Sequence, residues 1–513
     1  MTVFSNAFSV VTSSLGTIVV RLGIFAVLAR LLSPADFGVT AMAFAIIAIV
    51  APIVDLDLRD ALVQRIAIGP RHVLLAFLSC MISSALVCTL IMVIASAAQK
   101  FAGVEGLSVL LQAMCAILLL DGFGNIAQGL LLRARREKFV GRLELTGFAL
   151  GFGPIAIAAA LMGVGVWALA FGYIGMSVFR CALAWFEITR IQRDELFGVD
   201  REHRWLIVWK DLLRYTRAGV ATRLLMRTTQ NLDNILVGKF LSAEALGYYS
   251  RAFNMTSAPA NQLIGMTIRT VVFPEFVRRH HTDADATRHA AVRATQLGAM
   301  ILMPFCAILS VLSEEAVSIL LGSQWDRAAP VLSILAIGLA LRFAPRLSIA
   351  MCRAMGRLIP SVQMNLGTTL LICVLVPLGA INADIYGAAI ALTSILIVQS
   401  YWSLSILARA TGATISTFIA AQVRPAIIAL CAALIGLGCQ LICDILDLGA
   451  ITTVALVGAT LTIVALPFVS LFPRPLFPEW LRVRLGHFFT SLEARLPTPT
   501  HVILRFLSAR YSS

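Results

Sequence analysis

Apolar stretches long enough to cross a membrane follow one another along almost the whole of this chain. A membrane-spanning helix needs about 20 consecutive apolar residues, and 59% of the 513 residues are hydrophobic while only 13% are charged. A soluble protein of ordinary composition carries about 25% charged residues. Because the chain has room for many spans and for little else, an all-α integral membrane protein is predicted.

Fourteen membrane-spanning helices are predicted, with short connections between most of them. They cover residues 8–32, 36–57, 73–98, 107–131, 143–163, 165–187, 215–240, 246–273, 292–312, 329–350, 360–380, 385–407, 425–443 and 449–470. The first stretch has no basic segment before it and is longer than the apolar core of a signal peptide. It is therefore predicted to be an uncleaved first span.

The 41 lysine and arginine residues are distributed unevenly between the predicted loops. One set of alternating loops, together with the C-terminal tail, holds most of them, whereas the other set holds only Arg30, Lys100, Lys239 and Arg327. Basic residues favour the cytoplasmic side of a membrane, so both termini are predicted to be cytoplasmic, which requires an even number of spans. This bias accounts for the net charge of +14 without a nucleic-acid partner.

A short pattern occurs twice at one constant offset. Residues 28–40 read LARLLSPADFGVT and residues 237–249 read VGKFLSAEALGYY, which aligns Ser33 with Ser242 and Gly38 with Gly247. Each segment joins the first two spans of a six-span block. We therefore predict two six-helix lobes related by a pseudo-two-fold axis along the membrane normal, with a cavity between them, plus two extra helices.

The predicted domains follow from this repeat. They are an N-lobe at 1–187, a basic cytoplasmic linker at 188–214, a C-lobe at 215–410, two further spans at 411–471 and a cytoplasmic tail at 472–513. In the tail, apolar residues such as Trp480 and Phe488 recur at helical spacing between arginines, which predicts a basic amphipathic helix on the membrane surface.

Several polar and charged residues lie inside the predicted spans, where a charge that faces lipid costs at least a few kcal/mol. At 3.6 residues per turn they share one face of their helices. The candidate cavity residues are Arg21, Asp121, Asn125, Arg223, Arg227, Gln230, Asn234, Arg251, Gln262 and Arg269. Because arginines outnumber acids inside the spans, a phosphate-bearing ligand is predicted. The alternative is that these groups pair among themselves, with Asp121 and Asp233 neutralising two arginines.

Catalytic and metal-binding patterns are not found in the sequence. No HExxH, GxSxG or GxxxxGKS/T motif occurs, and no two cysteines lie in a loop at ligand spacing. The ten cysteines lie mostly inside spans, where packing is the favoured role. No catalytic residue, cofactor or metal site is therefore predicted, and the protein is not expected to be an enzyme.

Three segments resemble the Wzx-type polysaccharide flippases of the multidrug/oligosaccharidyl-lipid/polysaccharide (MOP) exporter superfamily. They read LARLLSPADFGVTAMAFAI, DLDLRDALVQR and QNLDNILVGKFLSAEALGYYSRAFNM, the last followed by VFPEF. The resemblance covers roughly residues 1–410. One departure is the run from Asp57 to Arg59, where relatives tend to carry a glycine-containing turn.

The resemblance implies a MATE/MurJ-like fold that exports undecaprenyl-pyrophosphate-linked oligosaccharides across the bacterial inner membrane by alternating access. It also implies an arginine-lined cavity, for which Arg21, Arg223, Arg227 and Arg251 are the matching positions, and a polysaccharide polymerase or co-polymerase as a further partner. A lipid II flippase and a MATE-type multidrug/cation antiporter are the alternatives, although an antiporter cavity should be acidic or apolar. An O-antigen polymerase or ligase would be expected to have a large extracytoplasmic loop, which this chain lacks.

Overall fold

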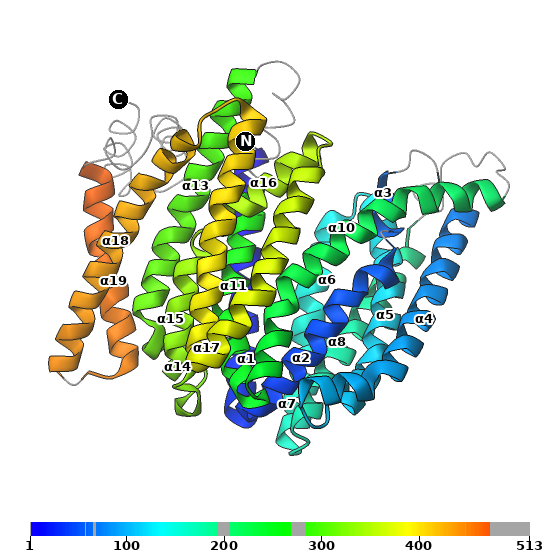
Figure 1. Cartoon of the computed structure of the whole chain (residues 1–513), viewed down its shortest axis with the longest axis horizontal. Helices are drawn as coiled ribbons and strands as arrows, with labels where there is room; N and C mark the ends of the chain where they lie inside the picture. Colours follow the sequence, from blue (N-terminus) through cyan, green and yellow to red (C-terminus); the bar gives the residue numbers. More distant parts are fainter. Residues whose placement is uncertain are drawn as a thin grey trace.

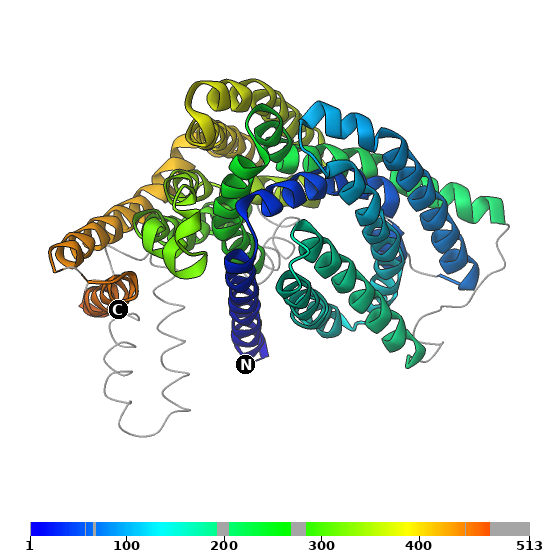
Figure 2. The same cartoon turned by 90° about the horizontal axis from the view of Figure 1, so that it is seen from below.

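In the computed structural model of this chain, every described element is a helix. The structure describes residues 2–56, 58–64, 68–191, 205–267, 284–446 and 448–471, and it contains no β-strand over these ranges. Figures 1 and 2 show the helices of residues 58–189, in blue to cyan, on one side of the molecule and the late helices, in yellow and orange, on the other, with the first helix, in dark blue, between them. The predicted all-α class is confirmed.

The N-terminal half of the molecule is defined as α1 to α8. Its helices are α1 (Thr2–Leu31), α2 (Pro34–Asp55), α3 (Leu58–Gln64), α4 (Pro70–Ala102), α5 (Leu107–Arg133), α6 (Glu137–Thr146), the π-helix η1 (Gly147–Phe152), α7 (Gly153–Leu161) and α8 (Val166–Thr189). Residues 192–204 of the predicted linker lie outside the described residues.

The C-terminal half is defined as α10 to α17, and two more helices follow it. Its helices are α10 (Trp205–Phe240), α11 (Ala243–Thr267), α13 (Ala284–Val311), α14 (Ser313–Leu320), the 3-10 helix η3 (Ser323–Trp325), α15 (Ala328–Leu339), α16 (Phe343–Ala354) and α17 (Ile359–Thr411). The last two are α18 (Ile415–Ile445) and α19 (Ala450–Leu471). The predicted tail at 472–513 lies outside the described residues, and α10 begins inside the predicted linker.

Each of the fourteen predicted spans overlaps one of these helices or one half of α17. Within the described residues, eight helices are long and apolar enough to cross a membrane, one of them the continuous run of α6, η1 and α7, and the bent pair of α15 and α16 raises the number to nine. The chain is therefore a multi-pass membrane protein. The number of fourteen crossings stays a prediction.

Two predicted spans are interrupted in different ways. In α17 the residues Ala383 and Asp384 leave the helical conformation, and this break falls between the predicted eleventh and twelfth spans. The predicted tenth span, 329–350, is broken into two helices, because α15 and α16 meet at an angle of 42°. Pro345 has no backbone N–H to donate to the preceding turn, which accounts for the break just before it.

The fifth predicted span contains the π-helical stretch η1, which is not evident from the sequence pattern. Gly147 and Gly151 allow α8 to approach closely: a Cβ on Gly151 would lie 2.9 Å from the Gly175 carbonyl oxygen, and one on Gly147 would lie 2.5 Å from the Cγ of Arg180. Single-turn π stretches are frequent at functional sites. Here the stretch brings Arg180 of α8 beside the end of α6.

The bundle has two ends, which we call the lower end and the upper end after their positions in Figure 1. The lower end in Figure 1 carries the turns at Ser33 and Ser242, and the upper end carries those at Gly69 and Gly412. The Ser33 hydroxyl accepts from the Asp36 N–H at 3.3 Å while the Asp36 carboxylate accepts from the Ser33 N–H at 3.0 Å, which is a capping box. The aligned Ser242 hydroxyl accepts from the Ala245 N–H at 3.0 Å. The two repeated serines therefore start equivalent helices.

The two repeated glycines meet where α2 crosses α11. A Cβ on Gly38 would lie 1.6 Å from the Ala243 carbonyl oxygen, and a Cβ on Gly247 would lie 1.9 Å from the Pro34 carbonyl oxygen. The contact is reciprocal, because Pro34 and Ala243 are themselves aligned by the repeat. Only glycine fits at either position, so the sequence repeat marks the place where the two halves touch backbone to backbone.

Side chains from the segment after α14 complete the lower end. The fully buried Trp325 donates its indole N–H to the Ala29 carbonyl oxygen at 2.9 Å, and its ring packs edge-on against Phe37. Arg30 donates to the Ile319 carbonyl oxygen at 2.9 Å. These contacts join α1 and α2 of the N-terminal half to the C-terminal half at the lower end.

The run from Asp57 to Arg59, where relatives tend to carry a glycine-containing turn, directly follows the turn that ends α2. Leu56 ends α2 in the left-handed conformation, with φ of 45°, which a glycine would adopt more readily. Asp57 lies outside the described residues, and α3 begins at Leu58. The chain therefore makes a left-handed turn here without glycine.

Candidate functional site

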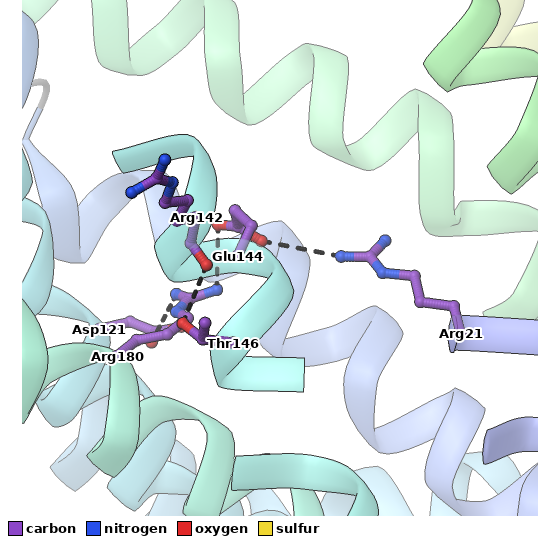
Figure 3. Close-up of polar contacts among 6 residues, drawn as sticks. All are labelled: Arg21, Asp121, Arg142, Glu144, Thr146 and Arg180. Carbon is purple, nitrogen blue, oxygen red and sulfur yellow. Dashed lines mark hydrogen bonds and ion pairs between the residues drawn. The ribbon is translucent and has the colours of Figure 1, made fainter. Parts of the chain in front are cut away.

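Four charged side chains from four helices form one network in the N-terminal half (Figure 3). Arg180 on α8 pairs with Asp121 on α5 at 3.0 Å and with Glu144 on α6 at 3.3 Å, and Glu144 lies 3.7 Å from Arg21 on α1. Two guanidinium groups and two carboxylates balance one another, so this network has no net formal charge.

The predicted polar face of α5 therefore has partners on neighbouring helices. Asp121 pairs with an arginine, as in the alternative considered from the sequence, but its partner is Arg180 rather than a candidate cavity residue. Asn125, one turn further along α5, donates to the Asp55 carboxylate on α2 at 2.7 Å. Both predicted residues hold helices of the N-terminal half together.

A cavity of about 210 Å³, the central cavity, lies between the two halves. Helices α1, α2 and α8 line it from one side, and α10 and α11 line it from the other. Its residues are Phe25, Phe37, Thr40, Ala41, Phe44, Ala45, Leu169, Tyr173, Gln230, Asn231, Asn234, Ser250, Arg251, Phe253 and Asn254. The N-terminal half contributes mainly aromatic and small apolar side chains, whereas the C-terminal half contributes amides and one guanidinium.

Arg251 is the one charged side chain among the described residues that line the central cavity. It is 8% exposed, and its guanidinium carbon lies 4.7 Å from the ring centre of Phe25 and 4.6 Å from that of Phe37. No carboxylate in the described part of the chain forms an ion pair with it, and its Nε has no hydrogen-bond partner there. Cation–π contacts stabilise this charge without neutralising it.

A second cavity of about 50 Å³ lies inside the C-terminal half and shares Gln230 and Phe253 with the central cavity. Three of its lining residues are charged: Asp233 of α10, Arg346 of α16, and Arg342, which directly precedes α16. Asp233 is 2% exposed and accepts a hydrogen bond from the Tyr249 hydroxyl at 3.0 Å. Its second carboxylate oxygen and the Nη1 of Arg342 have no hydrogen-bond partner among the described residues.

The two predicted arginines of α10 lie farther from the lower end than Arg251 does. At a rise of 1.5 Å per residue, Arg251 is about 12 Å from the start of α11 and Arg227 is about 20 Å from the end of α10. Arg223 and Arg227 both act electrostatically on Asp55 of α2, and Arg227 also acts on Arg346. Positive charge is therefore staggered in depth along the C-terminal half.

The other predicted cavity residues have different placements. Gln230 and Asn234 line the central cavity, and the side-chain oxygen of Asn234 is buried without a partner among the described residues. Gln262 is half-buried on α11 and lines neither of the two cavities. Arg269 lies outside the described residues.

With this geometry in place, the comparisons with known proteins decide the family. The sequence model of the polysaccharide biosynthesis protein family matches residues 27–330. The chain belongs to this family. Membership of the polysaccharide biosynthesis protein family agrees with the resemblance to the polysaccharide branch of the MOP superfamily, which is thereby confirmed.

Curated members with similar sequences carry names from polysaccharide biosynthesis. The succinoglycan biosynthesis transport protein ExoT of Rhizobium meliloti (strain 1021) is 26% identical over 336 residues, 66% of this chain and 66% of ExoT. The teichuronic acid biosynthesis protein TuaB of Bacillus subtilis (strain 168) is 25% identical, over 56% of this chain and 57% of TuaB. The lipopolysaccharide biosynthesis protein WzxC of Escherichia coli (strain K12) is 22% identical, over 75% and 77%. The chain spans just under two thirds of the first relative's length.

Two solved structures share the fold of this family member. The lipid II flippase MurJ in an inward closed conformation superposes with a TM-score of 0.68 at 13% identity, covering 91% of this chain and 99% of MurJ. An inward-facing multidrug resistance MATE family transporter of the MOP superfamily superposes with a TM-score of 0.60 at 14% identity, covering 82% and 98%. The predicted MATE/MurJ-like fold is confirmed.

Sequence reasoning missed several residues of this site. Glu144 lies at the start of the predicted fifth span and Arg180 lies inside the sixth, and only the tertiary contact shows that they pair. The aromatic residues around Arg251 look like lipid-facing side chains in a sequence that is apolar throughout. The repeat did carry a signal, because Phe37 directly precedes Gly38 at the crossing.

Proposed function

We propose that this protein is a flippase that moves undecaprenyl-pyrophosphate-linked oligosaccharide units across the bacterial cytoplasmic membrane for exopolysaccharide, O-antigen or capsule biosynthesis. The observation that carries the proposal is Arg251, a buried cation without an acidic partner in the described part of the chain, at the wall of a cavity between two halves. The names of ExoT, TuaB and WzxC support a polysaccharide precursor as the cargo.

The ligand would meet three kinds of surface. The arginines of α10 and α11 lie at different distances from the lower end, and Arg251 is the nearest to it among those described. They would hold the pyrophosphate through the planar donor fork of the guanidinium. The amides of Gln230 and Asn234 and the rings of Phe44 and Tyr173 would contact sugar hydroxyls and sugar faces. The polyprenyl chain would stay in the lipid. Arg21 of α1 is retained as a candidate contact, and Arg269, which lies outside the described residues, is retained as one expected near the cytoplasmic mouth.

Transport would proceed by alternating access between the N-lobe at 1–187 and the C-lobe at 215–410. The equivalent serine caps and the reciprocal glycine crossing support treating the lobes as repeats. Because the lower end carries so few basic residues, we place it on the extracytoplasmic side and both termini in the cytoplasm of the inner membrane. The contacts at the lower end would then close the outer side and would break for release. A reporter fused at Ser513 that is active only in the periplasm would refute this orientation.

Two other transport functions remain as alternatives, and no catalytic step is proposed. A lipid II flippase would share the cationic cavity and differ in its cargo. A MATE-type antiporter for cationic drugs is disfavoured by a cavity whose described lining has one charged side chain, a guanidinium. A polysaccharide polymerase or co-polymerase is the partner that we expect to receive the exported unit.

The test is export in a strain that lacks the gene, complemented with the wild type, Arg251→Ala or Arg251→Lys. Arg251→Ala should lower surface polysaccharide about tenfold, the loss expected for one charge-assisted contact, and lipid-linked units should accumulate at normal protein levels. Lysine should rescue partly, because it keeps the charge and loses the fork. The exposed Arg409→Ala on α17 is the matched control and should behave as the wild type.

Each other outcome of this experiment has a defined meaning. Accumulation of lipid II in place of the polysaccharide precursor would favour the lipid II alternative. A change in drug resistance with normal polysaccharide would favour the antiporter. Normal export by Arg251→Ala would overturn the site.

A further inference from the structure

The carboxylate of Glu144 is shared between two arginines that differ in their surroundings. Arg180 already has a carboxylate, because Asp121 pairs with it at 3.0 Å, and its side chain is only 12% exposed. Arg21 has Glu144 as its acidic partner, at 3.7 Å, and these two side chains are 36% and 49% exposed. The pair of Arg180 with Asp121 is therefore short and enclosed, whereas the pair of Arg21 with Glu144 is long and partly exposed. Figure 3 shows Glu144 between the two arginines.

This difference decides which pair can exchange partners. Exposed ion pairs contribute little to stability, because water and salt compete with them. Enclosed pairs are costly to break, because the remaining charge is left without a partner. Arg180 should therefore stay in place and keep Glu144 anchored, while the contact between Glu144 and Arg21 can open without disturbing the N-terminal half.

Arg21 does not itself line the central cavity, but it is close to a residue that does. It is one helical turn from Phe25 on α1, so the two side chains share a face of the helix. Phe25 lines the central cavity and packs on the guanidinium of Arg251. Since α1 runs from the upper to the lower end, Arg21 is one turn nearer the upper end than this ring. An anion that approaches Arg251 from the upper end comes within reach of Arg21.

We propose that Glu144 is a built-in competitor for the ligand's pyrophosphate: it occupies Arg21 when the cavity is empty and yields Arg21 when the ligand enters. Carboxylate and phosphate oxygens bind the same guanidinium fork, so Arg21 cannot serve both fully at once. Glu144 would weaken binding and favour release, because it recaptures Arg21 as the headgroup leaves. The inference rests on the proposed function, and it adds an acidic residue that tunes the same site.

The test is a binding titration with the purified full-length protein in lipid nanodiscs. The probe is undecaprenyl pyrophosphate without sugar, and binding is followed by native mass spectrometry. Glu144→Gln keeps the size and a hydrogen-bond acceptor but removes the charge, so it should bind the probe about three- to fivefold more tightly. In cells the same variant should export more slowly, because release is hindered. Glu137→Gln, an exposed acid in the first turn of the same helix, is the matched control and should change neither quantity.

A double variant separates the competitor role from a general charge effect. In an Arg21→Ala background, Glu144→Gln should no longer tighten binding, because the residue acts through Arg21. If Glu144→Gln is poorly folded by size exclusion, Glu144→Asp takes its place, since its shorter side chain draws the carboxylate back from Arg21 and should also tighten binding.

The two proposals fail in different ways. If the wild type binds no probe, the proposed function fails. If the wild type binds and both Glu144 variants bind equally or more weakly, the competitor role is wrong and the proposed function stands.

Discussion

The two halves of the molecule share two backbone features, a helix cap and a close-packed glycine, and differ in the balance of their charged side chains. A serine cap and a close-packed glycine occur at equivalent places on α2 and α11. In the N-terminal half, Arg21 and Arg180 face Asp121 and Glu144. In the C-terminal half the arginines around the two cavities have few acids near them, and Asp233 is already bonded to Tyr249. Two halves with the same backbone features can therefore differ in their sites. The N-terminal half balances its arginines with carboxylates, whereas the C-terminal half places an arginine without an acidic partner among the described residues at the central cavity.

The largest effect is expected at the shared crossing. Gly38→Leu should abolish export, because its side chain would occupy the place of the Ala243 carbonyl and the lower end could not close. Gly247→Leu should do the same, since the contact is reciprocal. Gly141→Leu on α6 has nothing within 4 Å of its Cβ position and should export normally. Export by one crossing variant but not by the other would break the equivalence of the halves.

The balanced network should matter for stability. Arg180→Ala leaves two carboxylates without their shared cation and should destabilise the protein by about 3 kcal/mol, seen as a lower midpoint of thermal unfolding in detergent. Arg288→Ala removes an exposed pair with Asp285 at 3.1 Å and should cost about 0.5 kcal/mol or less. Equal midpoints for the two variants would mean that the network is not structural.

The third expectation compares one arginine from each half. Arg251→Lys should lower export about fivefold, because an ammonium loses the stacking on two rings as well as the fork. Arg21→Lys should lower it by about twofold or less, because its exposed contact with Glu144 is available to any cation. Export rates in the complemented deletion strain measure both. The reverse order would place the main anion contact in the N-terminal half.

The smallest effect is expected where the halves face each other across α2 and α10. Asp55→Asn removes a carboxylate that acts on Arg223 and Arg227 while an amide oxygen can still accept from Asn125. Binding of undecaprenyl pyrophosphate should tighten about twofold, and the gain should disappear in about 1 M salt because screening is then strong. If the tighter binding persists at high salt, the substitution has changed the structure of the site and not its electrostatic potential.

More of the fold than of the candidate site could be predicted from the sequence. Apolar length located the helices, and the aligned serines and glycines located the place where the halves touch, because backbone requirements leave a residue signature. The polar faces that carry Gln230 and Asn234 on α10 and Arg251 on α11 were predictable from their spacing at 3.6 residues per turn. The partner of a charge was not, because Arg180 and Glu144 meet only through the packing of α8 against η1. The bend before α16 was also missed, because Pro345 was included in an apolar run long enough to be predicted as one span.

The glycine crossing also bears on how fast the molecule can change shape. Its close approach involves backbone atoms whose polar groups are already bonded within α2 and α11, so parting the helices there leaves no donor or acceptor without a partner. What is lost is dispersion, at about 0.1–0.2 kcal/mol for each atom pair. The hydrogen bonds from Trp325 to Ala29 and from Arg30 to Ile319 are different, because water must replace them. We therefore expect the main energetic cost of parting the two halves to fall on the few side chains beside the crossing.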